Sequence, residues 1–301
     1  MPTPNSHSIL RWRTAPLLAL FCLWAGGSAL EAQEVVAVLS SELAPYREAY
    51  AGFTEMLGTS VSQVSLQTGR PRIGRDTKVV VAFGSRAAGE EFPRQLPLLY
   101  CMAPGTALDV RQRQGPTVRV NMLPPAAKVA GLLREIQGPL KRLAVLWVVD
   151  TMDDYAVQLQ QAGGPLGIEV TAERLRSADE LPDHLRRLAG EQVEALWLLP
   201  DPLLISASSF ALLREFSRAN KVPLYAPTAG FAEEGAAAAV GISFAQNGRT
   251  AAEVVLALLA GREVPAEVYP DECEVTLNPA AAAAGLRFSP ETLHQAHRIV
   301  P

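Results

Sequence analysis

The sequence predicts a parallel α/β protein that folds as two lobes. Short apolar runs rich in β-branched residues alternate along the chain with segments whose apolar residues recur at helical spacing. The runs are apolar on both faces, as is typical of parallel strands buried between helices. The alternation restarts after Asn121-Met122, and this restart predicts a second lobe.

The first series of elements opens with a predicted strand at Val35–Leu39, a polar loop and a helix at 45–57. Further apolar runs predict strands at Val79–Phe83 and 98–100. The segment between Leu57 and Lys78 is short, so we expect one strand–helix unit of this lobe to be trimmed.

The second series repeats the alternation several times, which favours a parallel sheet covered on both faces. We expect strands at 143–149, 168–172, 195–199, 222–226 and 238–242, and helices at 124–136, 153–162, 181–188, 205–219, near Phe231, at 245–259 and at 290–299. The two series together predict two Rossmann-like lobes with parallel sheets joined by a hinge.

The first residues of the chain have the pattern of a secretory signal peptide, which we place at 1–32. Arg11 and Arg13 precede an apolar run at 15–25 and small residues at 26–29. The run is shorter than the roughly 20 residues that span a membrane, although an uncleaved anchor helix remains an alternative. Cleavage after Ala29 or Ala32 fits equally well, and we expect the mature protein in the periplasm.

Composition gives little reason to expect nucleic-acid binding or catalysis. The net charge of −4 is mild, and we find no nucleophile elbow, phosphate-binding loop or dinucleotide fingerprint. We therefore expect no enzyme activity, no cofactor, no metal and no nucleic-acid partner. Cys101 and Cys273 remain after the leader. They either pair in an oxidising compartment or stay separate as small buried residues, and we favour the second.

Small, hydroxyl and acidic residues follow the predicted strands. Ligands of open α/β sheets bind outside the carboxyl ends of the strands, so these loops predict a cleft. The alternative for any one loop is that its polar residue only caps a helix or forms a turn. The candidate ligand-binding residues are Ser40, Ser41, Gly84, Ser85, Asp150, Thr151, Asp201, Thr228 and Ser243.

Several segments occur in the order of a known family. They are KRLAVL at 141–146, ALWLLPD at 195–201, KVPLYA at 221–226, AVGISF at 239–244 and LLAGREVP at 258–265, with GSRAA at 84–88 in the first series. With these segments the chain resembles the ABC-transporter substrate-binding proteins of the tryptophan/tyrosine-binding type, within the class I periplasmic binding fold.

The resemblance implies a ligand held between the lobes by the loops named above. It implies that Ser85 and Thr228 donate to a ligand carboxylate and that Asp201 accepts from an ammonium. Departures from the family pattern at 149–152, 202 and 243–244 leave the identity of the ligand open.

The resemblance also implies the lobe boundaries and the function. We expect a first lobe of 34–122 plus 245–262 and a second of 123–244 plus 263–301. The implied protein is a monomeric solute-binding component of an ABC importer, which captures a small molecule by hinge closure and delivers it to an inner-membrane permease. The alternatives are a periplasmic sensing module that partners a membrane receptor, and an exported α/β enzyme.

Overall fold

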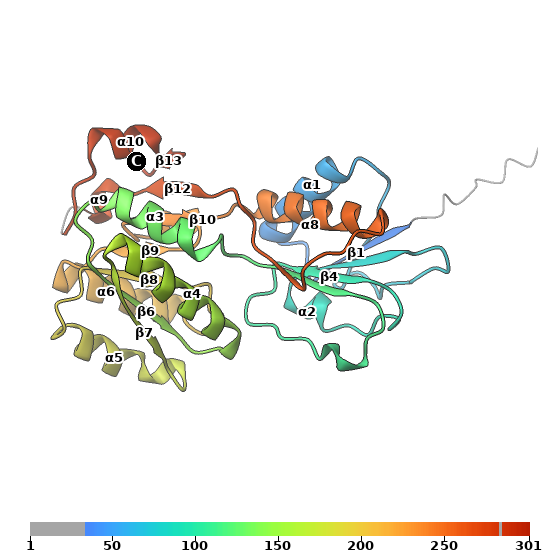
Figure 1. Cartoon of the computed structure of the whole chain (residues 1–301), viewed down its shortest axis with the longest axis horizontal. Coiled ribbons are helices and arrows are strands. Elements are labelled where there is room, and N and C mark those ends of the chain that lie inside the picture. Colours follow the sequence, from blue (N-terminus) through green and yellow to red (C-terminus); the bar gives the residue numbers. More distant parts are fainter. Residues whose placement is uncertain (1–33, 283–284) are drawn as a thin grey trace, which may run out of the picture. The chain divides into compact units, whose positions relative to one another are not determined.

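The computed structural model describes residues 34–282 and 285–301, so the predicted signal peptide lies outside the described residues. The described chain forms a sheet of six strands and a sheet of seven strands, each with its own helices (Figure 1). This arrangement confirms the predicted class of two α/β lobes.

The first sheet is parallel throughout and has the order β11-β5-β4-β3-β1-β2. Its strands are β1 (Val35–Leu39), β2 (Ser62–Ser65), β3 (Val79–Phe83), β4 (Leu98–Cys101), β5 (Thr117–Val120) and β11 (Glu267–Val268). Every residue of β1, β3 and β4 is buried, as expected of strands covered on both faces.

Two long helices cover one face of the first sheet. They are α1 (Ala44–Leu57) and α8 (Phe244–Leu259), whose buried side chains pack on Phe83 and its neighbours. The two helices approach closely because Gly248 has no side chain. A Cβ at this position would lie 1.8 Å from the carbonyl oxygen of Ala49. The short α2 (Ser85–Ala88) and the loops around β4 pack on the opposite face.

The second sheet has the order β13-β12-β10-β9-β8-β6-β7. Its strands are β6 (Arg142–Trp147), β7 (Glu169–Arg174), β8 (Ala195–Leu198), β9 (Leu224–Ala226), β10 (Ala238–Gly241), β12 (Glu274–Leu277) and β13 (Arg298–Ile299). All neighbours pair in parallel except β10 and β12, which are antiparallel.

Helices bury both faces of the second sheet. The helices are α3 (Ala126–Ile136), α4 (Asp153–Gly163), α5 (Leu181–Leu188), α6 (Ala207–Asn220), α7 (Ala229–Glu233), α9 (Pro279–Ala282) and α10 (Pro290–Gln295). Apolar residues of α3 and α4 pack around Trp197 on one face, whereas those of α5 and α6 pack around Leu198 on the other. The 3-10 turns η1 (Val110–Gln112), η2 (Asp150–Met152), η3 (Gly164–Leu166) and η4 (Ala178–Glu180) lie in the connections.

Two expectations for the end of the chain were wrong. Residues 267–268 were assigned to the second lobe, but they form β11 and pair with β5 of the first sheet, where Glu267 meets Arg119. The predicted helix at 290–299 ends at Gln295, and Arg298–Ile299 pair with β12. Isolated two-residue strands have no periodic pattern that a sequence could reveal.

The chain passes between the two sheets three times: after β5, between β10 and α8, and between β11 and β12. The trimmed unit of the first lobe is also visible, because among the described residues β2 is followed by a loop and not by a helix. Cys101 is buried, Cys273 is half-buried, and both are free thiols.

Candidate functional site

A cavity of about 290 Å³ lies at the carboxyl ends of β9 and β10. Thr228 follows β9 and Ser243 follows β10, and both predicted site residues line this cavity. Parallel strands end at the same edge of a sheet, which explains why residues distant in sequence meet there.

The floor of the cavity is one face of the β10–β12 pair. Gly241 lies opposite Glu274 and Ala239 lies opposite Thr276 in the antiparallel register, and all four residues line the cavity. Opposite residues of a pair share a face. Gly241 lets the loop after β9 approach closely, since a Cβ there would lie 1.8 Å from the carbonyl oxygen of Pro227, while β12 supplies a carboxylate and a hydroxyl to the lining.

The helices packed on the first sheet supply the remaining wall. Glu48 of α1 and Phe244 of α8 line the same cavity as the β9 and β10 loops. A ligand in this cavity would therefore contact elements of both lobes.

Thr228 and Ser243 differ in how their hydroxyls are used. Ser243 is the N-cap of α8, and its Oγ accepts a hydrogen bond from the backbone N–H of Gln246 at 3.3 Å. Thr228 occupies the N-cap position of α7 without any side-chain capping bond. The Thr228 hydroxyl thus remains available to a ligand.

At the neighbouring corner, after β6 and β8, Asp201 is fully buried. Its Oδ2 accepts from the backbone N–H groups of Val148 at 2.6 Å and Val149 at 2.9 Å, and its Oδ1 accepts from Leu203 at 2.8 Å. A carboxylate has about four acceptor positions, and three are taken by this backbone. The carboxylate therefore fixes the loops after two adjacent strands.

Asp150 and Thr151 lie in η2, directly after the β6 loop. Asp150 is exposed, whereas the Thr151 hydroxyl is buried without a partner among the described residues. Neither lines the cavity that contains Thr228 and Ser243.

A small second cavity, of about 20 Å³, lies nearby and is lined by Tyr100, Asn121, Met152 and Pro200 among others. Gly105 adopts φ +72°, and a Cβ there would lie 2.9 Å from the Pro202 ring. The loop after β4 is therefore already in contact with the loop after β8, which leaves little room at this corner.

The predicted residues of the first sheet hold its loops together. Ser40, at the end of β1, accepts through Oγ from the backbone N–H of Ala87 at 2.9 Å. Gly84 has φ +98°, and a Cβ would lie 2.5 Å from that Oγ, so glycine is required. Ser41 accepts weakly from Leu43 at 3.4 Å, and Ser85 is exposed.

The structure thus brings Thr228 and Ser243 into one cavity and places the side chain of Ser40 against Gly84. Three polar lining residues were not predicted from the sequence: Glu48, Glu274 and Thr276. Two of them lie on β12, which runs antiparallel, so the start of the strand and not its end reaches the carboxyl edge. The acidic segment before the apolar Val275 was the only available signal in the sequence.

A polar network joins the segments that cross between the sheets. Glu267 accepts from Arg119 and from Asn121 Nδ2, the latter at 2.9 Å, and Asn247 Nδ2 donates to the Asn121 carbonyl at 2.6 Å. Burial raises the pKa of Glu267, but hydrogen bonds from Asn121 and Arg119 outweigh it, so the pKa is lowered. Burial raises the pKa of Tyr269 to about 12.

Aromatic side chains connect this polar network to the second lobe. Tyr269 stacks on Tyr155 with ring centroids 6.0 Å apart, and the Tyr155 hydroxyl donates to the Pro124 carbonyl at 2.9 Å. The crossing segments after β5 and after β11 are therefore linked through α4.

Over residues 34–282 and 285–301, no group of three or more His, Cys, Asp or Glu side chains has the arrangement of a metal site. In the same residues, none of the helices combines the length and apolar character needed to cross a bilayer.

Two α/β units with facing loop edges define the class I periplasmic-binding-protein fold, and solved structures agree. The ABC domain in complex with L-Trp from Streptococcus pneumonia has a TM-score of 0.62 at 15% identity, with 89% of this chain and 99% of that chain covered. The ligand-free, open structure of a substrate binding protein with adhesive properties from Clostridium difficile has a TM-score of 0.63 at 16% identity and the same coverage. At these identities the likeness shows the fold.

The family comparison is more specific. Residues 154–297 match the profile of the ABC transporter substrate binding protein family. The chain is also similar to the tyrosine-binding protein of Clostridioides difficile, with 25% identity over 162 residues, 53% of this chain and 43% of that protein. The match thus spans less than half of that relative. These findings confirm the resemblance to the ABC-type substrate-binding proteins that the sequence predicted.

Proposed function

We propose that this protein is the periplasmic solute-binding component of an ABC importer. It would capture a small molecule between its lobes by hinge closure and present the loaded form to an inner-membrane permease. The family is a binding-protein type and not an enzyme family, which supports this assignment.

The observation that carries the proposal is the cavity at the ends of β9 and β10. Its walls come from the loops of the second sheet and from α1 and α8 on the first. A molecule held there favours the closed form, because it contacts both lobes only when they approach.

The proposal includes the division of the chain and the roles of the loops. The first lobe would comprise 34–122 with 245–262 and β11, and the second the rest of the mature chain. Thr228 and Ser85 would present hydroxyls to the ligand. Asp201, whose carboxylate is occupied by backbone N–H groups, would shape the rim without contacting the ligand.

The test uses the full chain, expressed with its own leader and purified from the periplasmic fraction. A thermal-shift panel of amino acids, amines, sugars, nucleosides and organic acids should reveal one class that raises the melting temperature. Ligand at about 100 times Kd stabilises the native state by about 2.7 kcal/mol. Small-angle scattering with that ligand should show a smaller radius of gyration.

Two results would contradict the proposal. One is a panel in which no class raises the melting temperature. The other is chemical conversion of the bound molecule, detected by mass spectrometry of the material recovered after incubation.

A further inference from the structure

Five arginines of the first lobe have no partner among the described residues. They lie between β2 and β4, and their side chains are exposed and form neither an ion pair nor a hydrogen bond with the described part of the chain: Arg70, Arg72, Arg75, Arg86 and Arg94. We call these five residues the arginine patch. The segment 66–96 also contains three carboxylates and Lys78, which pairs with Glu34. The net charge of this segment is therefore positive, although that of the whole chain is −4.

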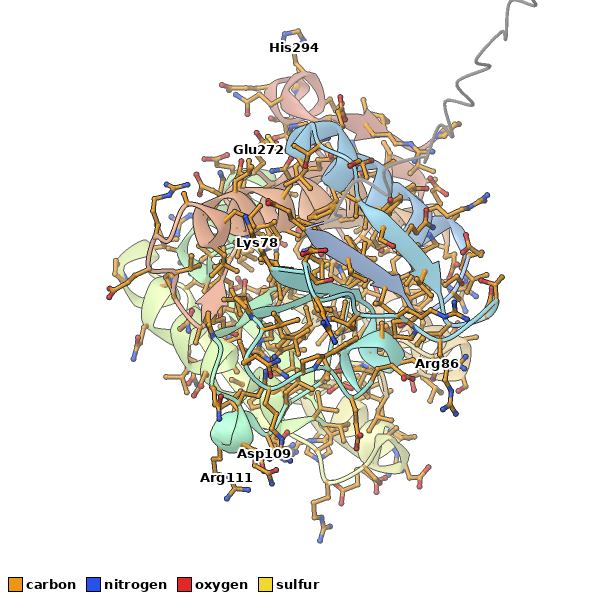
Figure 2. All side chains as sticks on the ribbon, turned by 90° about the vertical axis from the view of Figure 1, so that its right-hand side faces the viewer. Lys78, Arg86, Asp109, Arg111, Glu272 and His294 are labelled. Atoms are coloured by element: carbon orange, nitrogen blue, oxygen red, sulfur yellow. The ribbon has the colours of Figure 1, made fainter. Side chains whose placement is uncertain are left out.

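The segments that carry the arginine patch cover one face of the first sheet. Side chains alternate between the two faces along a strand, and that of Ala82 on β3 belongs to the face opposite α1 and α8. Leu66 and Ile73 of the β2–β3 loop, the helix α2 and Phe92 pack on the same apolar cluster as Ala82. Figure 2 shows Arg86 of α2 below the strands, with α1 and α8 above them.

The charge is densest in the loop between β2 and β3. Residues 70–75 of this loop read RPRIGR, so three arginines occur in six positions with no carboxylate between them. Residues 69–74 form neither helix nor strand, and the loop takes the place of the helix in the trimmed unit. Ile73 packs on the sheet, which leaves the three arginines on the solvent side.

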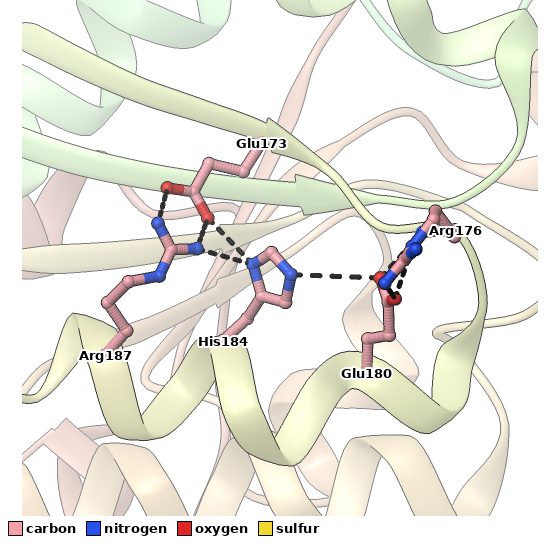
Figure 3. A network of polar contacts seen from close by, with 5 residues as sticks. All are labelled: Glu173, Arg176, Glu180, His184 and Arg187. Carbon is pink, nitrogen blue, oxygen red and sulfur yellow. Dashed lines mark hydrogen bonds and ion pairs between the residues drawn. The ribbon is translucent and has the colours of Figure 1, made fainter.

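Arginines in the rest of the described chain have partners. In the second lobe, Arg187 donates to Glu173 at 2.7 Å and Arg176 donates to Glu180 at 2.6 Å, as Figure 3 shows. Outside the arginine patch, every described arginine holds an ion pair or donates a side-chain hydrogen bond, except the exposed Arg47, Arg262 and Arg287. The absence of partners is thus concentrated in one short segment of the chain.

The chemistry of the arginine patch fits phosphate groups at a membrane surface. A guanidinium donates two parallel hydrogen bonds to a phosphate, and clusters of about four to eight basic residues bind anionic lipid headgroups. An interface with another protein normally has a dry core of aromatic and apolar side chains. No large apolar side chain within 66–96 is exposed, so this face lacks such a core.

We infer that the arginine patch binds the anionic phospholipid headgroups of a membrane surface. The inference goes beyond solute binding, because it gives the first lobe a second interaction that does not depend on the identity of the solute. Each arginine close to an anionic bilayer strengthens binding by about fivefold. Salt screens exposed charges, so the binding depends on ionic strength.

The test is vesicle flotation with the full chain, expressed with its own leader and purified from the periplasmic fraction. One set of vesicles contains phosphatidylcholine alone, and the other contains equal parts of phosphatidylcholine and phosphatidylglycerol. At low ionic strength we expect binding to the second set to be at least about tenfold stronger than to the first. Binding to the second set should be lost at high salt.

A triple variant locates the binding in the β2–β3 loop. Arg70→Gln/Arg72→Gln/Arg75→Gln removes three positive charges and should weaken binding to the phosphatidylglycerol vesicles by at least about tenfold. The three side chains are exposed and unpaired, so the melting temperature should stay at its wild-type value.

A second triple variant is the charge-matched control. Arg47→Gln/Arg262→Gln/Arg287→Gln removes the same charge from the three exposed and unpaired arginines outside the arginine patch. It should weaken binding by less than about threefold, because these positions do not lie together on the face that meets the lipid.

Three results would overturn the inference: no binding of the wild-type protein to phosphatidylglycerol vesicles, equal binding to both sets of vesicles, or an equal loss of binding in both triple variants. If the patch variant instead loses binding to polyglutamate, and the wild-type protein ignores the vesicles, the partner is an acidic protein and the inference is also overturned. These measurements contain no solute, so their failure leaves the proposed function unaffected.

Discussion

Two neighbouring corners of the second sheet use similar residues for opposite purposes. After β6 and β8, Asp201 is buried and its carboxylate is consumed by three backbone N–H groups. After β9 and β10, Thr228 and the carboxylate of Glu274 line a cavity of about 290 Å³ and bond to none of the described residues through their side chains. Asp201 thus fixes the corner after β6 and β8, whereas the polar side chains after β9 and β10 remain available to a ligand.

A polar residue after a strand therefore does not by itself mark a ligand contact. The neighbouring backbone separates the two corners: the loops after β6 and β8 point N–H groups at Asp201, whereas Thr228 and Glu274 line the open cavity. Three substitutions test this contrast, each with a different expected effect on stability.

The largest effect is expected for Asp201→Ala. Removing the carboxylate leaves three backbone donors without an acceptor, so the free energy of unfolding should fall by about 3–5 kcal/mol. Urea denaturation followed by circular dichroism measures it. Asp154→Ala, at an exposed position of α4, should change stability by less than about 0.5 kcal/mol. A stable Asp201 variant that loses ligand binding would reverse our assignment of this residue.

A smaller effect is expected for Ser243→Ala. The substitution removes the capping bond to Gln246 at the start of α8, which should lower the free energy of unfolding by about 1 kcal/mol. Chemical denaturation checks the value, with Ser85→Ala as the exposed, uncapped control. A loss below about 0.3 kcal/mol would show that the cap adds little at this site.

The smallest effect on stability is expected for Thr228→Val. Its hydroxyl makes no capping bond, so the free energy of unfolding should change by less than about 0.5 kcal/mol. Affinity for the bound solute should nevertheless fall, as titration calorimetry would show. A marked loss of stability with unchanged affinity would place Thr228 with the structural corner.

Much of the fold was predictable from the sequence because buried parallel strands and amphipathic helices have strong patterns. The apolar runs at Val35–Leu39 and Val79–Phe83 became β1 and β3 with the expected bounds. β2, β5 and β12 were missed, since they are short and carry polar residues such as Gln63, Arg119 and Glu274. Only their pairing with neighbours far along the chain makes them strands.

The site was less predictable for a related reason. Thr228 and Ser243, which line the cavity, were predicted because they follow strands that the sequence revealed. Glu48 lies in the middle of a helix and Glu274 begins an antiparallel strand, so neither follows a recognisable strand end. The structural role of Asp201 could not be predicted from the sequence either, because two of its three backbone donors lie fifty-three and fifty-two positions away.

The direction of β12 has a consequence for how the ligand selectivity of such a protein can change. A strand that enters the sheet from the rim places its first side chain at the mouth while its later ones, Val275 and Leu277, pack inside. Replacement of Glu274 would therefore change the charge at the mouth of the cavity without disturbing the packed interior. In this architecture, ligand selectivity can change through single substitutions at the first residue of the strand.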